Sequence, residues 1–526
     1  MKVLVTDSLS DKGLEILRNA AGIEVDVRAG IDAADLKRII GDYHALIIRS
    51  GTNVTADILE NAKSLKVIGR AGVGVDNVDV DKATRHGIIV MNSPEGNTIS
   101  TCELTMAMIL SLSRRVAEAS ASTKAGEWDR KRFKGMELKH KTLGIIGLGR
   151  IGQEVAARAA AFGMKITGYD PFCPIERAER IGAKLVSLEQ LLTAADVITL
   201  HVPLTDDTRG MIGSDEFELM KKGVKIVNCA RGGIIDERAL CQAIRDGIVS
   251  GCALDVYQDE PPKNSPLLAL DEVVATPHIG AVTAEAQDNV AIDIATQVID
   301  ALQGRHMRNA VNLPEIDREA FDGLRPYVIL AEKLGMLLVQ MMGSLSRSAS
   351  ISFRGEINDH DVTPLTRSFV CGLLKPVLQQ TVTMVNAPAI ARERGLEVTE
   401  IKSTAPEDYI SLITVEGSSG STAYSFSGTI FAKDQPRIVR IDGLEVDIAL
   451  HGPMLVCHNL DQPGAISHLT TVLARRHINV ARMSVGRDQP GGRAIIVLNI
   501  DEPVPEEVIS EIKALDIITD VRVVQV

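Results

Sequence analysis

Residues Leu143 to Gly152 read LGIIGLGRIG, an apolar run that ends in the pattern G-x-G-x-x-G. A helix-like segment follows from Gln153 to Phe162, and a second strand-like run from Lys165 to Tyr169 ends in Asp170. Glycines at these spacings permit a tight turn, a close approach of the backbone to a phosphate and close packing of helix on strand. The order of strand, glycine turn, helix, strand and acid predicts a dinucleotide-binding βαβ unit.

The acid at the end of the second strand distinguishes between two dinucleotides. A carboxylate there accepts hydrogen bonds from a ribose diol and repels a 2′-phosphate. The next residues are Pro171, Phe172 and Cys173, so no arginine follows Asp170 to receive such a phosphate. The sequence therefore predicts NAD as the cofactor, bound through the motif residues Gly147, Gly149, Gly152 and Asp170.

The composition narrows the class of protein. A chain of 526 residues with 45% hydrophobic residues is long enough for several domains. A net charge of −12 argues against a nucleic-acid partner. The sequence contains no apolar run of about 18 residues, which is the length that would predict a membrane span. The seven cysteines are scattered without a C-x-x-C pair, and residues 1–7 resemble a first strand rather than a signal peptide. We expect a reduced, cytoplasmic protein with no metal site.

The first half of the chain alternates short apolar runs with helical patterns, which predicts two doubly wound parallel sheets. The runs are residues 3–5, 45–48, 65–68 and 88–91, and then 143–146, 165–169, 197–200, 224–228 and 273–276. A helix at 100–117 connects the two sheets, and a helix at 283–302 is long enough to return to the first. We therefore expect a discontinuous substrate-binding domain, residues 1–97 and 283–312, around an NAD-binding domain, residues 98–282.

The second half begins after the linker-like residues 312–314. Residues 313–448 have mixed character, and their Leu- and Met-rich helix at 327–342 predicts a core or subunit-interface element. Residues 450–526 follow the order β-α-β-β-α-β, which predicts a ferredoxin-like unit.

Three residues suit the oxidation of a 2-hydroxy acid, and all follow strands at the edge where a nicotinamide would lie. The guanidinium of Arg231 can grip a carboxylate, and His278 can take the hydroxyl proton while Glu260 orients its ring. Each residue has a structural alternative: Arg231 could cap Asp236, His278 could be a core or capping histidine, and Glu260 could be a solvated acid. Their joint occurrence favours catalysis.

Four motifs resemble the D-isomer-specific 2-hydroxyacid dehydrogenase family: residues 147–152 with Asp170, 228–233, 255–261 and 276–280. Residues 69–79 and 128–135 are similar to the branch that acts on a phosphorylated acid. Residues 313–448 resemble its intervening domain, and residues 450–526 resemble an ACT domain, a small-molecule regulatory module. The expected fold class is thus α/β, with two Rossmann-like domains, an intervening α+β domain and a C-terminal βαββαβ ACT domain.

The resemblance implies NAD-dependent oxidation of 3-phospho-D-glycerate (3-phosphoglycerate) to 3-phosphooxypyruvate, the first step of phosphorylated L-serine synthesis. It implies catalysis by Arg231, Glu260 and His278. It implies further cofactor contacts at Arg150, Ile151, Cys229, Ala230, Arg231, Asp255, His278, Ile279, Gly280 and Ala281. It implies substrate contacts at Arg49, Ser50, Val73, Gly74, Asn97 and, from a neighbouring subunit, Arg130.

In the ACT-like unit, Asn459, Asp461 and Asn479 occupy positions that contact L-serine as an effector in the family. Asn459 and Gln462 depart from the usual residues there, so serine inhibition is a hypothesis. A homodimer or homotetramer is expected. Two alternatives remain: a dehydrogenase for an unphosphorylated acid such as glycerate, and a non-catalytic NAD-sensing protein of the corepressor kind.

Overall fold

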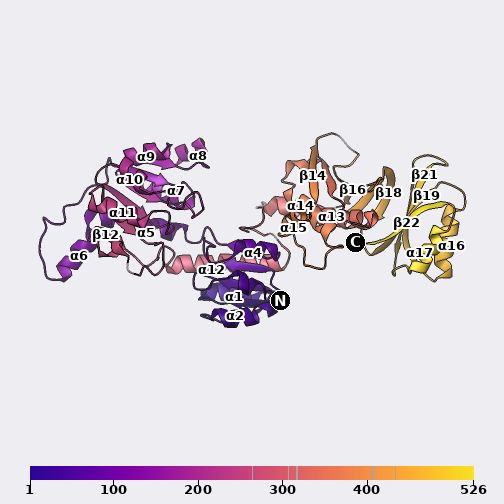
Figure 1. The fold of residues 1–526 in the computed structure, drawn as a ribbon, viewed down its shortest axis with the longest axis horizontal. Helices are drawn as coiled ribbons and strands as arrows, with labels where there is room; N and C mark the ends of the chain where they lie inside the picture. The colour runs from indigo at the N-terminus through magenta and orange to yellow at the C-terminus, as the bar shows by residue number, and fades with distance from the viewer. Residues whose placement is uncertain (264, 306, 315–317, 406–407, 433) are drawn as a thin grey trace.

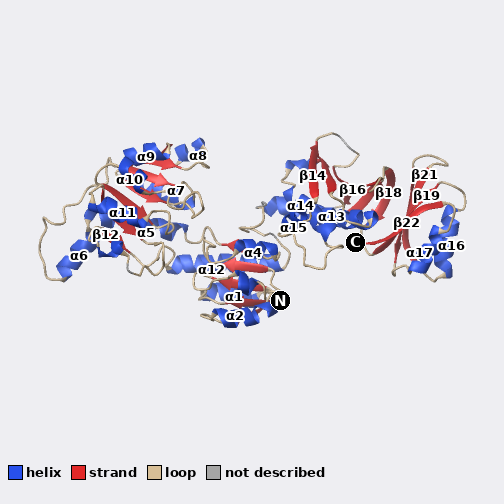
Figure 2. Ribbon diagram, viewed as in Figure 1, coloured by secondary structure: helices blue, strands red, loops and turns tan. Residues whose placement is uncertain are grey.

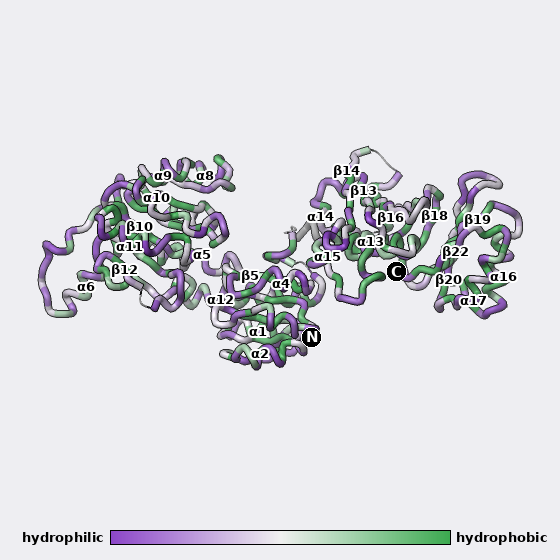
Figure 3. The backbone as a smooth tube through the Cα atoms, in the orientation of Figure 1, coloured by the Kyte–Doolittle hydropathy of each residue, from purple (hydrophilic) through white to green (hydrophobic). Residues whose placement is uncertain are grey.

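The computed structural model describes residues 1–526 except 264, 306, 315–317, 406–407 and 433, and it omits the side chains of 318–322. Within the described residues the strands form four sheets, which follow one another along an elongated molecule (Figure 1). Helices cover the sheets of every unit (Figure 2), and the hydrophobic residues concentrate along the strands (Figure 3). Each sheet is therefore the centre of its own core.

The first sheet is parallel, with the strand order β2-β1-β3-β4-β5. Its central strand β3 is buried at every position, as expected of a strand with helices on both faces. Helix α12 returns from the second sheet and packs on this one beside α1. The strands are β1 (Lys2–Val5), β2 (Glu24–Val27), β3 (Ala45–Ile48), β4 (Val67–Arg70) and β5 (Ile89–Asn92). The helices are α1 (Asp11–Asn19), α2 (Ala33–Ile39), α3 (Ala56–Leu59), α4 (Val80–Arg85) and α12 (Ala284–Leu302).

The second sheet is also parallel, with the order β12-β11-β10-β9-β6-β7-β8. Two apolar clusters, one on each face, bury its strands. Its strands are β6 (Thr142–Ile146), β7 (Lys165–Tyr169), β8 (Ala183–Leu185), β9 (Val197–Leu200), β10 (Val224–Asn228), β11 (Val249–Leu254) and β12 (Val273–Ala275). Its helices are α5 (Thr98–Arg114), α6 (Val116–Lys124), α7 (Arg150–Ala161), α8 (Ile175–Arg180), α9 (Leu188–Ala194), α10 (Ser214–Leu219) and α11 (Glu237–Arg245).

The third sheet is mixed, with the order β14-β13-β15-β16-β17-β18 and one parallel pair, β13 with β14. Helix α13 supplies its core: Leu330, Leu334 and Leu337 are fully buried beneath the sheet. The strands are β13 (Ser348–Gly355), β14 (Glu397–Ser403), β15 (Ser411–Ser419), β16 (Thr422–Phe431), β17 (Gln435–Ile441) and β18 (Leu444–Ala449). The helices are α13 (Arg318–Met342), α14 (Thr363–Leu374) and α15 (Ala387–Glu393).

The last sheet is antiparallel, with the order β20-β21-β19-β22 and helices α16 and α17. Helices α16 and α17 cover one face of this sheet. The opposite face joins the core of the third unit, where Met454 and Val497 are buried with α13 residues. Polar bonds support this junction: His458 Nε2 lies 3.0 Å from Asp442 Oδ2, and Gln340 bonds the backbone of Gln525 in both directions. The elements are β19 (Pro453–Leu460), α16 (Ala465–Arg475), β20 (Val480–Arg487), β21 (Arg493–Ile500), α17 (Glu506–Lys513) and β22 (Ile518–Gln525).

The expected elements differ from the observed ones in a few places. Helix α5 ends at Arg114, before the expected residue 117, because Arg115 adopts a left-handed φ of 51° and α6 starts after it. Strand β4 begins two residues later than the apolar run at 65–68. The supposed linker begins later too, because the side chain of Asn312 bonds Val90 N and Ile88 O of the first unit.

Candidate active site

The glycine turn after β6 leaves an uncovered stretch of backbone. Gly147 has a φ of 94°, and a Cβ on it would lie 2.7 Å from the carbonyl oxygen of His201. A Cβ on Gly152 would lie 2.1 Å from Gly147 O, so only glycine lets α7 pack this closely. Nothing lies within 4 Å of the position that a Gly149 Cβ would occupy. The turn therefore opens toward space at the N-terminus of α7, where a phosphate fits.

Asp170 lies beside this turn at the end of β7. Its Oδ2 accepts the N–H of Leu148 at 2.9 Å, and its Oδ1 accepts the N–H of Phe172 at 2.9 Å. These bonds fix a carboxylate next to the glycine turn. The arrangement suits an unphosphorylated ribose and opposes a 2′-phosphate.

His278 and Glu260 form a pair beyond the end of β12. His278 Nδ1 lies 2.7 Å from Glu260 Oε2, and Glu260 Oε1 accepts the N–H of Tyr257 at 3.2 Å. Burial raises the pKa of Glu260, but the hydrogen bond and charge of His278 outweigh it and bring the pKa below its ordinary value. The bond through Nδ1 directs Nε2 away from Glu260, so that this nitrogen can exchange a proton with a ligand.

Asp255 holds the loop that carries His278. Its side chain is fully buried at the end of β11, and it accepts the N–H groups of Ile279 and Gly280, both at 2.8 Å. Its Oδ1 also accepts the hydroxyl of Thr276 at 2.6 Å. Both carboxylate oxygens are thus used in shaping the loop, a function that sequence reasoning did not assign to this expected cofactor contact.

Cys229 and Ala230 follow β10. The Cys229 thiol points into the core, and burial raises its pKa to about 12. Only the backbone of Cys229 can therefore take part in binding. The N–H of Ala230 donates to Asn228 Oδ1 at 3.0 Å, which keeps the loop close to the strand end.

Arg231 reaches from the second sheet to the first. Its Nε donates to Asp76 Oδ2 at 3.0 Å, and its Nη1 donates to Ala230 O at 2.7 Å. The structure does not support the alternative in which Arg231 caps Asp236, because Arg231 pairs with Asp76, and Asp236 instead caps α11 by accepting the N–H groups of Arg238 and Ala239. Arg231 thus lies where the loops after β10 and β4 meet.

The first sheet contributes polar groups to this meeting point. Arg49 follows β3 and is anchored through its N–H to Asp7 and through Nη1 to Ser8 O, while Ser50 is exposed. Val73 O accepts the side-chain amide of Asn92. Asn97 precedes α5, and its buried Oδ1 has no partner within the described part of the chain.

Sequence reasoning missed Arg70 and Asp76. Arg70 ends β4 and is half-buried; burial, and then the charge of Arg231, lower its pKa to about 10. Its Nε is buried without a partner among the described residues. The signal was available, because Arg70 ends a buried strand as Arg49 nearly does, and charges rarely occur there without a function.

Arg130 lies apart from the other expected substrate residues. It belongs to an exposed segment that follows α6, a helix with no buried residue, and Trp128 in this segment is 79% exposed. Figure 1 shows this segment projecting from the second unit. Its neighbour Arg132 is tethered to Asp271 at 3.5 Å.

The three expected effector residues are engaged within the chain. Asp461 Oδ2 accepts Arg487 Nη1 at 2.8 Å and Gly491 N–H at 3.1 Å, and these bonds lower the pKa of Asp461. Asn479 donates to Asp501 at 2.7 Å. Asn459 is buried; its Nδ2 donates to Leu460 O at 2.8 Å, while its Oδ1 has no partner among the described residues.

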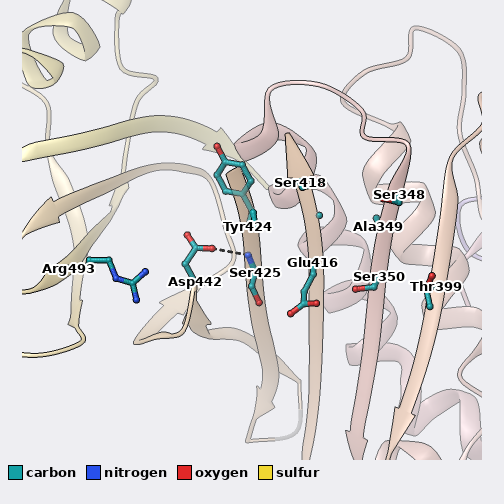
Figure 4. Close-up of a pocket in the computed structure, with 12 residues that line it drawn as sticks. Ser348, Ala349, Ser350, Thr399, Glu416, Ser418, Tyr424, Ser425, Asp442 and Arg493 are labelled. Atoms are coloured by element: carbon teal, nitrogen blue, oxygen red, sulfur yellow. Dashed lines mark hydrogen bonds between the residues drawn. The ribbon is translucent and has the colours of Figure 1, made fainter. Parts of the chain in front are cut away.

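A separate hollow of about 600 Å³ lies over the outer face of the third sheet (Figure 4). Thr399, Ser350, Glu416 and Ser425 line it as neighbours in register across β14, β13, β15 and β16. Asp442 accepts the N–H of Ser425 at its rim, and Arg493 approaches from the last unit. Most of the residues that line the hollow have polar side chains, and all of them belong to the C-terminal half of the chain.

Within the described residues, no group of three or more His, Cys, Asp or Glu residues could hold a metal ion. A search of the same residues finds no helix that is long and apolar enough to cross a membrane.

The fold and the residues in the loops after the strands define an NAD-binding dehydrogenase of 2-hydroxy acids. Residues 106–280 match the family model described as D-isomer specific 2-hydroxyacid dehydrogenase, NAD binding domain. Residues 323–442 match the D-3-phosphoglycerate dehydrogenase intervening domain, and residues 454–516 match the ACT domain. The chain belongs to the D-3-phosphoglycerate dehydrogenase family.

Full-length relatives support this assignment. A D-3-phosphoglycerate dehydrogenase of Methanocaldococcus jannaschii is 46% identical over 100% of this chain and 99% of its own length. One from Bacillus subtilis is 40% identical over 99% of both. A solved D-lactate dehydrogenase from Aquifex aeolicus, complexed with NAD and lactic acid, is 30% identical and covers 57% of this chain and 96% of its own, with a TM-score of 0.51. A glyoxylate reductase from Paecilomyes thermophila is 32% identical over 58% of this chain and 95% of its own, with a TM-score of 0.54.

Proposed function

We propose that this protein oxidises 3-phospho-D-glycerate to 3-phosphooxypyruvate with NAD, the entry step of phosphorylated L-serine synthesis. The observation that carries the proposal is the His278–Glu260 pair, 2.7 Å apart, at the same edge of the second sheet as Arg231. The name shared by the full-length relatives points to the same reaction.

NAD fits the glycine turn, because Gly149 leaves open backbone at the start of α7 and Asp170 stands beside it. When bound, NAD accepts the hydride that leaves C2 of the substrate. Residues of three loops would hold it: Gly147, Gly149, Arg150, Ile151, Gly152 and Asp170 in the first; Cys229, Ala230 and Arg231 in the second; Asp255, His278, Ile279, Gly280 and Ala281 in the third.

The three proposed catalytic residues have different roles in the reaction. His278 Nε2 accepts the proton of the 2-hydroxyl group, and the adjacent carboxylate of Glu260 stabilises the resulting imidazolium. Arg231 holds the substrate carboxylate through paired N–H donors and polarises the 2-oxygen. In the reverse direction the imidazolium returns its proton to the 2-oxygen.

The substrate phosphate requires cations on the side of the first sheet. Arg49 follows β3, and the half-buried Arg70 ends the neighbouring strand β4, so their guanidinium groups can meet a phosphate together. Ser50, Val73, Gly74 and Asn97 complete this side of the site. We assign Arg130 to the site of a neighbouring subunit, because it lies on an exposed segment away from this cleft.

This assignment rests on a division of the chain into a substrate-binding domain, residues 1–97 and 283–312, and an NAD-binding domain, residues 98–282. Residues 313–448 and 450–526 then form intervening and ACT domains in a homodimer or homotetramer. The free state of all seven cysteines agrees with a reducing, cytoplasmic setting.

L-Serine is the proposed effector of the ACT domain, at Asn459, Asp461 and Asn479. Because Asp461 already pairs with Arg487, a serine ammonium group must compete with that guanidinium. Inhibition by millimolar serine that disappears in an Asp461→Ala variant supports this site. Equal inhibition of the variant contradicts it.

The function is tested by NADH oxidation with 3-phosphooxypyruvate and hydroxypyruvate side by side. A preference for the phosphorylated acid supports the proposal. Equal or better use of hydroxypyruvate identifies a general 2-hydroxyacid dehydrogenase instead. Binding of NADH without turnover of either acid identifies a non-catalytic NAD sensor.

A further inference from the structure

The carboxylate of Asp76 accepts a hydrogen bond from one edge of the Arg231 guanidinium. An arginine offers five N–H donors, of which Nε and Nη2 form one edge of the planar group, and Nη1 and Nη2 form the other. In this structure Nε donates to Asp76 Oδ2 at 3.0 Å, and Nη1 donates to Ala230 O at 2.7 Å. The contact joins residues 155 positions apart, from loops after β4 and β10.

Gly74 confirms which edge Asp76 occupies. A Cβ on Gly74 would lie 1.9 Å from Arg231 Nη2 and 2.7 Å from Asp76 Oδ2. Carboxylate and guanidinium therefore rest together on the bare backbone of this loop. The edge formed by Nε and Nη2 faces Asp76. Nη1 carries two N–H groups and donates one of them to Ala230 O, so the second N–H of Nη1 and an N–H of Nη2 can still meet a ligand carboxylate.

Asp76 also lies between two cations. Burial lowers the pKa of Arg70, the positive charge of Arg231 lowers it further, and the negative charge of Asp76 opposes both effects. Without Asp76, Arg70 and Arg231 would repel each other across a partly buried loop. The hydrogen bond of Asp76 thus orients Arg231, and its negative charge weakens the repulsion between the two guanidinium groups.

We propose that Asp76 is a positioning residue for the reaction, which turns the Nη1/Nη2 edge of Arg231 toward the substrate carboxylate. This inference rests on the proposed function. Asp76 does not touch the substrate; it acts through Arg231, and it ties the substrate-binding loop to the NAD-binding domain. Asparagine keeps the acceptor oxygen that orients the guanidinium and loses only the charge, so it can replace aspartate in this orienting role.

The test compares Asp76→Ala, Asp76→Asn and a control, Asp81→Ala, which removes an exposed carboxylate from the first turn of α4. With the keto acid that the wild-type enzyme reduces, Asp76→Ala lowers kcat about tenfold or more, since small misplacements of a binding group cost up to about a hundredfold. KM changes by less than about threefold, because loss of a negative charge near an anion offsets weaker binding. Asp76→Asn recovers most of kcat, and Asp81→Ala resembles the wild type.

The affinity for NADH, measured by fluorescence, separates positioning from structural damage. It stays within about threefold of the wild type in all three variants if Asp76 acts through Arg231 alone, because the other NAD contacts, among them Gly149 and Asp170, are untouched. Overturning results are a kcat for Asp76→Ala equal to that of Asp81→Ala, no recovery in Asp76→Asn, or loss of NADH affinity. If the wild-type enzyme reduces hydroxypyruvate but not its phosphorylated form, the proposed substrate is wrong. The kinetics of the Asp76 variants are then measured with hydroxypyruvate, so that the role of Asp76 is still tested.

Discussion

The Nδ1 atom of His278 lies 2.7 Å from Oε2 of Glu260, although 18 residues separate them in the chain. The backbone of the His278 loop is held from below by Asp255, and Glu260 is held by the N–H of Tyr257. The pair is therefore built from two anchored loops rather than from two mobile side chains. Such rigidity is what acid–base chemistry at a fixed substrate atom requires.

Replacing His278 by Asn should lower turnover strongly and leave coenzyme binding intact. A positioned acid–base group contributes about 10²- to 10⁴-fold, so kcat should fall by that range in both directions. The NADH dissociation constant, measured by fluorescence titration, should equal that of the wild type. Glu260→Gln is the matched comparison: it keeps a polar partner for Nδ1 and should lose less activity than His278→Asn. A larger loss in Glu260→Gln would contradict the assigned division of labour.

Replacing Asp170 by Ala should weaken the preference for NAD over NADP. The carboxylate repels a 2′-phosphate and can bond the ribose hydroxyls, interactions worth about 1–3 kcal/mol, or roughly 10- to 100-fold. The kcat/KM for NAD should fall and the ratio between the two coenzymes should narrow. Since Asp170 also bonds Leu148 N–H, the variant should use NAD poorly as well. An unchanged coenzyme ratio would remove Asp170 from the ribose site.

Replacing Arg49 by Gln should affect phosphorylated and unphosphorylated acids differently. If its guanidinium binds the phosphate, KM for 3-phosphooxypyruvate should rise about tenfold or more, as expected for a lost charge-assisted hydrogen bond of about 1.5–3 kcal/mol. KM for hydroxypyruvate, which has no phosphate, should change little and serves as the internal control. Equal increases for both acids would place Arg49 at the carboxylate instead.

His201 should make the second sheet sensitive to acid. Its ring follows β9, with a buried, unpartnered Nδ1 within the described structure, and burial lowers its pKa from 6.5 to about 4. As the pH falls, the histidine is protonated in the unfolded chain at a higher pH than in the folded protein. The free energy of unfolding is therefore highest above pH 6.5 and falls by about 3 kcal/mol as the pH drops toward 4. His201→Gln should reduce this loss. The hydrogen-exchange rates of the β9 amides near pH 7.5 and pH 5, corrected for intrinsic rates, measure this loss of stability. The same loss in the wild type and in His201→Gln would contradict the prediction.

The sequence predicts the parts of the fold that are encoded locally. Strand β7 was expected at residues 165–169 and is found there, because its place between the helix after the glycine turn and the acid Asp170 marks it as the second strand of the βαβ unit. Strand β2, with the sequence EVDV, was missed because its half-exposed residues leave no apolar run. The break at Arg115 was also missed, since a left-handed arginine has no sequence signature.

The residues of the candidate active site could also be predicted only where a local motif encodes them. The glycine turn and the loop histidine belong to short motifs, so the residue types could be recognised from the chain alone. The meeting of Arg231 with Asp76 depends on how two sheets are placed against each other, and no local pattern encodes that. The pairing of Asp461 with Arg487 joins a loop to the end of β20 for the same reason. Tertiary structure supplied these partners.

The central claim is that a hydride leaves C2 of the phosphorylated D-acid. Incubation of NAD with 3-phospho-D-glycerate deuterated at C2, followed by mass spectrometry of the coenzyme, tests it directly. The account predicts NADH that carries one deuterium, formed in equal amount with 3-phosphooxypyruvate, and formation of this product about 10²- to 10⁴-fold more slowly by the His278→Asn enzyme. NADH without deuterium, or deuterated NADH formed from labelled glycerate but not from its phosphate ester, would contradict it.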